Sequence, residues 1–374
     1  MDYESLVNEV SSKYGYNEEL QIAIRLTLPL MVKQYGEERI SDICDLFRNT
    51  RIFATNDMSA KNREHMEEIM LNGANSHLVI DDGEDPYQTD IDPGSYYSYQ
   101  AIYDEEMNVV GEARWVAVKD MEGTLNCEQY KNLFGTTINM PYFIHEINHA
   151  FAMQNPTYRK EGDRIFAKHG MVEQEFLFAS HDGKIELKDD MTNNIIIEEA
   201  INEKITQDML LELMRVSEYS EVARMLQDIN HVSSSYSPVL ISLAEKMENI
   251  LGKEALLNWR KDNDVNVLRD FNMTAVQSDI AMKYFNGQTP YDYFDQKCFA
   301  IFLLKCNSYK MPIEEYGKRN KELMVEAFAP LCAYQDKKIG TMSVEKFDSI
   351  RTGILGIEID NTKTNTVEEG TKTM

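Results

Sequence analysis

The chain has no run of about 18 apolar residues, the length that a membrane-spanning helix requires. We therefore expect no membrane span and no membrane partner. Basic residues are also few, because 38 Lys and Arg stand against 63 Asp and Glu and the net charge is −25. A surplus of acid repels nucleic-acid phosphates, so we expect no nucleic-acid partner.

Cysteine is scarce and widely spaced. The five cysteines are odd in number and form no Cys-x-x-Cys pair; they are Cys44, Cys127, Cys298, Cys306 and Cys332. This pattern is typical of reduced thiols rather than of a disulfide framework. The first residues, Met-Asp-Tyr-Glu-Ser-Leu, are acidic and amphipathic and do not predict a signal peptide. We therefore expect the protein to be cytoplasmic.

The segment with the clearest chemical signature is His-Glu-Ile-Asn-His, residues 145–149. Residues at positions i and i+4 share one face of a helix, so His145 and His149 can both turn a ring nitrogen toward one metal ion. Glu146 follows the first histidine, where its carboxylate could take a proton from a metal-bound water. The surrounding residues 139–153 have apolar side chains at helical spacing, with Asn139 as the expected N-cap, and predict a largely buried helix.

A second helix is predicted over residues 195–213, where apolar residues again recur at helical spacing. Glu199 and Glu203 lie four residues apart on one face of this helix. A catalytic zinc site needs a third protein ligand and an open position for water. One of these carboxylates could be that ligand while the other accepts an N–H from a ligating histidine. In so acidic a chain, a solvated helix face is the alternative interpretation.

His-Glu-x-x-His followed by a helix with Glu-x-x-x-(Asp/Glu) resembles the gluzincin class of zinc metallopeptidases, the thermolysin-like enzymes. The resemblance implies that Glu199 is the third zinc ligand and that Glu203 orients a histidine. Residues 198–203, Glu-Glu-Ala-Ile-Asn-Glu, are similar to the class pattern Asn-Glu-(Ala/Gly)-x-(Ser/Thr)-(Asp/Glu), with Glu198 in place of Asn. A second register, in which Glu203 of the Asn202-Glu203 pair binds the metal, stays open.

In this class a tyrosine or histidine from later in the chain stabilises the oxyanion of the tetrahedral intermediate. The segment 231–238, His-Val-Ser-Ser-Ser-Tyr-Ser-Pro, contains both residue types. We expect Tyr236 to have this role, with His231 as the alternative. An aromatic residue at a helix start without a catalytic role is the plainer interpretation of Tyr236.

Alternating apolar residues predict β-strands near the two helices. Residues 172–187 predict a hairpin with its turn at Asp182-Gly183, and residues 109–118 predict one or two further strands. The gluzincin resemblance implies a sheet whose edge binds the substrate backbone by strand addition. We expect residues 113–118 to form that edge.

The sequence therefore predicts a mostly α-helical α+β protein. Its small mixed or antiparallel sheet packs on the His-Glu-x-x-His helix and on a second helix that carries glutamates. Four regions are predicted. Residues 1–80 form an N-terminal helical region, and residues 81–264 form a zinc metallopeptidase-like domain. Residues 265–360 form a C-terminal helical region, and residues 361–374 form a disordered tail.

The function predicted from these residues is hydrolysis of a peptide bond by a zinc-bound water, with Glu146 as the general base and Zn²⁺ as the cofactor. The partner is then a peptide or protein substrate, and a restricted one, since a promiscuous intracellular peptidase would damage its own cell. Two alternatives stay open: a regulatory or interaction module that keeps an idle zinc site, and a zinc hydrolase of a non-peptide amide. The intact Glu146 counts against the idle site.

Overall fold

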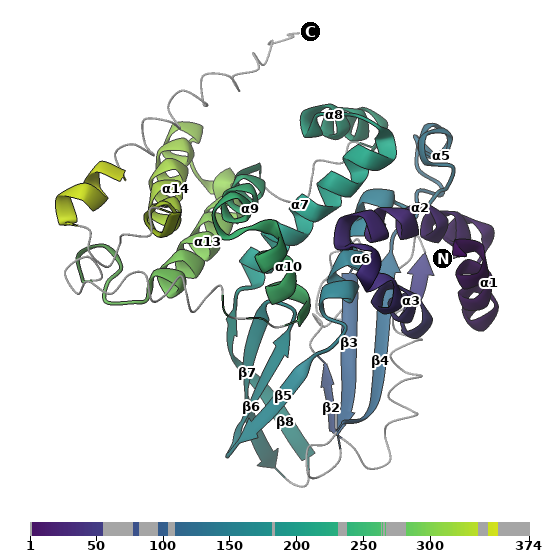
Figure 1. Ribbon diagram of the computed structural model, residues 1–374, viewed down its shortest axis with the longest axis horizontal. Coiled ribbons are helices and arrows are strands. Elements are labelled where there is room, and N and C mark those ends of the chain that lie inside the picture. Colours follow the sequence, from purple (N-terminus) through teal and green to yellow (C-terminus); the bar gives the residue numbers. More distant parts are fainter. Residues whose placement is uncertain are drawn as a thin grey trace. The chain divides into compact units, whose positions relative to one another are not determined.

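The chain forms two compact units, Met1–Tyr236 with Arg260–Asp262, and Ser237–Trp259 with Asn263–Met374. The computed structural model describes residues 2–54, 78–81, 96–103, 109–181, 184–230, 238–262, 264, 266, 282–335 and 343–350 (Figure 1). Helices dominate these residues, and two small four-stranded sheets accompany them. The predicted mostly helical α+β class is confirmed. The predicted boundaries at residues 80, 264 and 360 stay predictions.

The first unit begins with three helices, α1 (Tyr3–Tyr14), α2 (Glu18–Tyr35) and α3 (Ile40–Asn49), with a 3₁₀ turn at Glu37–Arg39 before α3. Polar residues cap the first two, because Asp2 accepts the N–H groups of Glu4 and Ser5 and Asn17 accepts that of Leu20. Gly15 ends α1 in the left-handed conformation, with φ 71°. The local sequence thus fixes where these helices start and stop.

The first sheet is mixed and holds β1 (Arg51–Ala54), β2 (Leu78–Asp81), β3 (Tyr96–Tyr103) and β4 (Val109–Val118). The strand order is β1-β4-β3-β2, with β1 parallel to β4 and the other pairs antiparallel. The predicted strands at residues 109–118 are therefore one strand. The prediction that residues 113–118 form the sheet edge is wrong, because β1 pairs with Trp115–Val118 on the side opposite β3.

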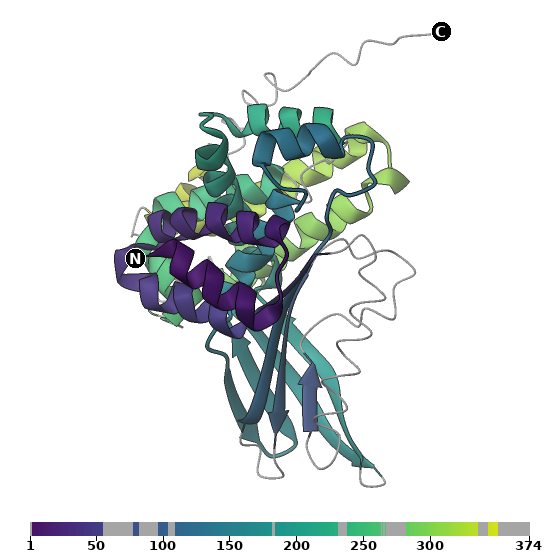
Figure 2. The same cartoon turned by 90° about the vertical axis from the view of Figure 1, so that its right-hand side faces the viewer.

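The second sheet is an antiparallel meander in the order β5-β6-β7-β8 (Figures 1 and 2). Its strands are β5 (Thr157–Glu161), β6 (Arg164–His169), β7 (Val172–His181) and β8 (Lys184–Asn193). His181 pairs with Lys184 at the end of β7 and the start of β8, so the predicted hairpin is confirmed. The predicted turn residues, Asp182 and Gly183, lie outside the described part of the chain.

His169, at the end of β6, is a buried imidazole that makes stability depend on pH. It is 2% exposed, and burial lowers its pKa to about 4. Because an unfolded histidine has a pKa of about 6.5, the unfolded state binds more protons between these values, and stability falls as pH falls. We expect about 2 kcal/mol of unfolding free energy to be lost through His169 between about pH 7 and about pH 5.

Urea unfolding of the parent and of His169→Gln at the two pH values measures this contribution. The difference between the two proteins isolates His169 from the carboxylates that also titrate. An identical pH dependence in both proteins would contradict the assignment.

The helix that carries the histidine pair, α6 (Met140–Ala152), packs on β3 and β4 and along α7 (Ile195–Met214). All of its residues from Phe143 to Ala152 are buried. In Figure 1, β3 and β4 are the labelled strands below α6. The predicted packing of a small sheet on this helix is confirmed, whereas the glutamate-bearing helix α7 contacts β7 of the second sheet. Two further helices, α5 (Cys127–Phe134) and α8 (Tyr219–Asn230), complete the described part of this unit.

The start of α6 is capped differently from the prediction. Asn139 stands at the N-cap position, but its side chain makes no cap hydrogen bond and instead contacts Met121 Sδ at 3.7 Å. The Met140 N–H donates to the Tyr130 hydroxyl at 2.5 Å, and Tyr130 is fully buried. A tyrosine from α5 therefore anchors the first turn of the motif helix.

Replacing Tyr130 with phenylalanine leaves the buried Met140 N–H without its acceptor. We expect a loss of about 1–3 kcal/mol of unfolding free energy, the cost of an unsatisfied buried donor. Urea unfolding measures it, with Tyr3→Phe as the control because no hydrogen bond of the Tyr3 hydroxyl is found among the described residues. Equal stability of Tyr130→Phe and the parent would contradict this role.

The second unit is helical where it is described. It contains α9 (Pro238–Leu251), α10 (Lys253–Asp262) up to Trp259, α13 (Pro290–Cys306), a 3₁₀ turn at Ser308–Lys310 and α14 (Ile313–Gln335). Four aromatic residues and one alanine form a core cluster in it: Tyr284, Phe285, Tyr293, Phe347 and Ala329. The aromatic-rich sequence of this region is thus explained by packing.

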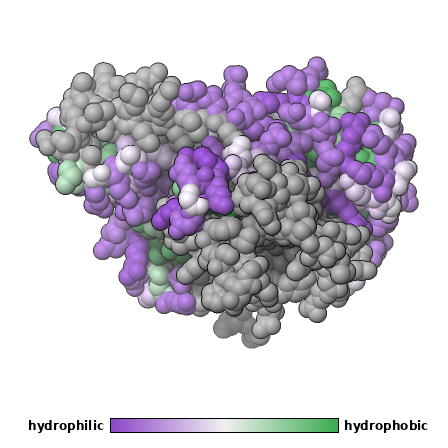
Figure 3. Space-filling view, turned by 90° about the horizontal axis from the view of Figure 1, so that it is seen from below, coloured by the Kyte–Doolittle hydropathy of each residue, from purple (hydrophilic) through white to green (hydrophobic). Residues whose placement is uncertain are grey.

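Among the described residues, no helix is both long enough and apolar enough to cross a membrane. On the face shown in Figure 3, the described residues are mostly hydrophilic, with smaller hydrophobic areas. Charged side chains make up 27% of the sequence, which accounts for this polar surface.

Candidate metal centre

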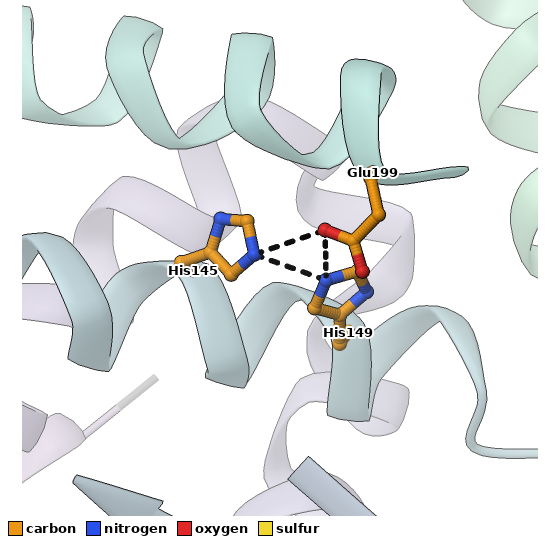
Figure 4. Close-up of side chains that lie close together, drawn as sticks. All are labelled: His145, His149 and Glu199. Carbon is orange, nitrogen blue, oxygen red and sulfur yellow. Dashed lines mark hydrogen bonds and ion pairs between the residues drawn. The ribbon is translucent and has the colours of Figure 1, made fainter. Parts of the chain in front are cut away.

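Three ligand-type side chains converge between α6 and α7. His145 and His149 lie one turn apart on α6, and Glu199 reaches toward both from α7 (Figure 4). The two Nε2 atoms are 3.1 Å apart, and Glu199 Oε2 is 3.3 Å from each of them. The structure thus brings together the three residues that the sequence predicted as metal ligands.

The triangle of ligand atoms has the dimensions of a tetrahedral zinc site. Zinc binds histidine nitrogen and carboxylate oxygen at about 2.0–2.1 Å, so tetrahedral ligands lie about 3.3–3.4 Å from one another. The observed separations of 3.1–3.3 Å are close to this value. The histidine side chains are 9% and 7% exposed, whereas that of Glu199 is 21% exposed. The donor set therefore fits zinc and remains reachable from solvent.

Each histidine has a carboxylate at its other ring nitrogen. Glu203 Oε2 lies 3.2 Å from Nδ1 of His145, the outer position that the sequence predicted for Glu203. Glu198 Oε1 lies 3.3 Å from Nδ1 of His149, within ion-pair distance, although the angles at this contact are not those of a hydrogen bond. Carboxylates at this position fix the tautomer and orientation of a ligating ring.

Glu198 is a residue of the site that the sequence analysis missed. The class pattern holds asparagine at this position and so predicts no carboxylate there. The sequence feature that could have indicated this role is its place on the helix. Successive residues are rotated by about 100° around the helix axis, so the residue before Glu199 can face the second histidine.

These contacts set the charges of the site before any metal binds. Burial disfavours a charged imidazole, but the hydrogen bonds from His145 to Glu199 and Glu203 outweigh it and raise the pKa of His145 to about 10. Burial likewise opposes charge on His149, and Glu199 and Glu198 raise its pKa. Burial also opposes charge on Glu199, but the two histidines hold its pKa well below the ordinary value. A metal ion that binds at Nε2 of His145 must displace the proton that this nitrogen carries in the charged ring.

Glu146, the predicted general base, follows His145 on α6 and is 8% exposed. Its negative charge contributes to the raised pKa of His145, which indicates that the two groups are close. Tyr236 and His231, the two predicted oxyanion donors, lie outside the described residues, and so the choice between them stays a prediction.

A pocket opens beside His145. The cavity itself has a volume of about 40 Å³, and the space of about 470 Å³ around it includes open solvent. The lining combines two residues of the site with apolar and aromatic side chains of α6, α7 and α8, among them Tyr142, His145, Glu203, Leu210, Tyr219 and Leu226.

No protein-family model, curated protein or solved structure matches this chain. The resemblance to gluzincins therefore depends on the residues of the site alone. Those residues support a metal centre, and the family stays a prediction.

Proposed function

We propose that this protein is a zinc-dependent peptidase whose active site is formed by His145, His149 and Glu199. The observation that carries the proposal is the convergence of their three ligand atoms at separations of 3.1–3.3 Å. Three protein ligands and access from solvent favour a catalytic site over a closed structural one.

The distances around the ligand triangle support the roles of the ligands and of Glu203, whereas the roles of Glu146 and of Tyr236 or His231 come from the gluzincin resemblance. Bound zinc would supply a Lewis acid that polarises the scissile carbonyl and lowers the pKa of water at its open position. Glu146 accepts the proton of the attacking water and passes it to the leaving amine. Glu203 keeps the His145 ring in its ligating orientation. Tyr236, or else His231, donates a hydrogen bond to the oxyanion.

The pocket beside His145 would receive an apolar side chain of the substrate, and the site residues in its lining are His145 and Glu203. Tyr142, Leu210 and Leu226 supply the apolar part of its lining. Cytoplasmic residence is part of the proposal, and it is supported by Cys127, Cys298 and Cys332, which form no disulfide among the described residues.

A cleavage screen on a library of proteome-derived peptides tests the proposal. We expect the zinc-loaded protein to cut a small subset of peptides, with apolar residues enriched beside the cut. A zinc chelator should abolish cleavage, and added zinc should restore it. Cleavage that persists without metal would contradict the proposal, and no cleavage by a zinc-loaded protein would favour a non-peptide amide or an idle site.

A further inference from the structure

A buried ion pair lies behind the candidate metal centre. Arg260, in the last turn of α10, and Glu198 are each 1% exposed. The Nε and Nη2 atoms of Arg260 donate to Glu198 Oε1 at 2.8 and 2.6 Å. A buried charge is costly unless it is paired and hydrogen-bonded, so each member of this pair depends on the other.

The ion pair leads directly to a metal ligand. The same Glu198 oxygen that receives both Arg260 hydrogen bonds lies 3.3 Å from Nδ1 of His149. The opposite nitrogen of this ring, Nε2, is a corner of the ligand triangle. Arg260 therefore occupies the end of a chain of contacts that runs through Glu198 to the metal-facing side of His149.

Arg260 also joins the two helices that carry the ligands. Its Nη2 donates to Asn202 Oδ1 on α7, and Asn202 Nδ2 donates to the His145 carbonyl at 2.9 Å. Its Nη1 donates to the Tyr35 hydroxyl at 3.2 Å, and that hydroxyl donates to Asn148 Oδ1 at 2.8 Å. One guanidinium thus contacts α7 directly and α6 through two further side chains.

We propose that Arg260 is a positioning residue of the metal centre. It holds the Glu198 carboxylate at Nδ1 of His149, so that Nε2 of this ring faces the metal. The neighbouring Glu199, and not Glu198, is then the carboxylate that binds the metal. This inference rests on the metal centre of the proposed function, but it needs no particular substrate.

The test compares zinc dissociation constants, measured by competition with a chromophoric chelator, for the parent, Arg260→Met and Lys261→Met. We expect Arg260→Met to bind zinc about tenfold more weakly, a loss typical of outer-sphere partners. Electrostatics alone predicts tighter binding, because the variant has lost a positive charge near a divalent cation. Lys261 is the matched control: it is 6% exposed and donates to Gln154, not to the site, so its variant should keep the parental constant.

Glu198→Gln/Arg260→Met keeps the net charge and leaves neither buried charge unpaired, so it tests the inference should Arg260→Met not fold. We expect about a tenfold loss of zinc affinity in the double variant, and a changed absorption spectrum when Co²⁺ replaces zinc. Parental affinity and spectrum in the folded variant would overturn the positioning role and leave the metal centre intact. A parent that binds no zinc would overturn both.

Discussion

Replacing Glu146 with glutamine is expected to lower kcat for peptide hydrolysis by about 10²–10⁴-fold, the usual contribution of a general acid–base residue. Glutamine has nearly the same shape as glutamate but cannot accept the proton of the attacking water. Because Glu146 is absent from the ligand triangle, zinc affinity should stay close to that of the parent. The measurement is the rate on a peptide from the screen, at a zinc occupancy equal to that of the parent.

Glu175→Gln is the matched control for that experiment. Glu175 is 9% exposed, on β7, where it forms an ion pair with Arg164. Its replacement removes a carboxylate of similar burial from the same unit, so any general effect on folding should appear in both variants. Hydrolysis that survives in Glu146→Gln at the parental rate would remove the proposed mechanism.

Glu199→Gln is expected to reduce zinc affinity by at least about a hundredfold, whereas Glu203→Gln should cost about tenfold. Glu199 Oε2 is 3.3 Å from Nε2 of both histidines, whereas Glu203 Oε2 faces Nδ1 of His145 on the other side of the ring. An amide is a poor substitute for a ligating carboxylate, but it can still accept a hydrogen bond from a ring N–H. Competition with a chelator measures both constants.

The control for charge is Glu212→Gln, at the exposed end of α7, where Glu212 pairs with Lys33. It removes the same charge from the same helix, and we expect zinc affinity to stay at the parental value. If Glu203→Gln lost more affinity than Glu199→Gln, the second register would be right, and Glu203 would be the ligand.

The sequence predicts the site well because helical geometry fixes it locally. His145 and His149 must share a face of α6, and Glu199 and Glu203 must share a face of α7, wherever the two helices pack. Apolar spacing predicts that both helices are buried. The packing of the two helices against each other then follows from the rule that buried helices and a sheet share one hydrophobic core.

Features that depend on distant contacts could not be predicted in this way. Arg260 lies 62 residues after Glu198, and no local pattern indicates that it enters the same core. Tyr130 replaces Asn139 as the hydrogen-bonding cap of α6 because tertiary packing overrides a local preference. β4 is an inner strand because β1, which comes from a region predicted to be helical, pairs beside it.

The central claim is that His145, His149 and Glu199 hold zinc, and metal content tests it most directly. Plasma mass spectrometry of the purified protein, beside a His145→Ala/His149→Ala variant, gives the stoichiometry of each bound metal. We predict close to one zinc per chain in the parent and none in the variant. A folded parent that holds no zinc, even after zinc is added back, would contradict the account.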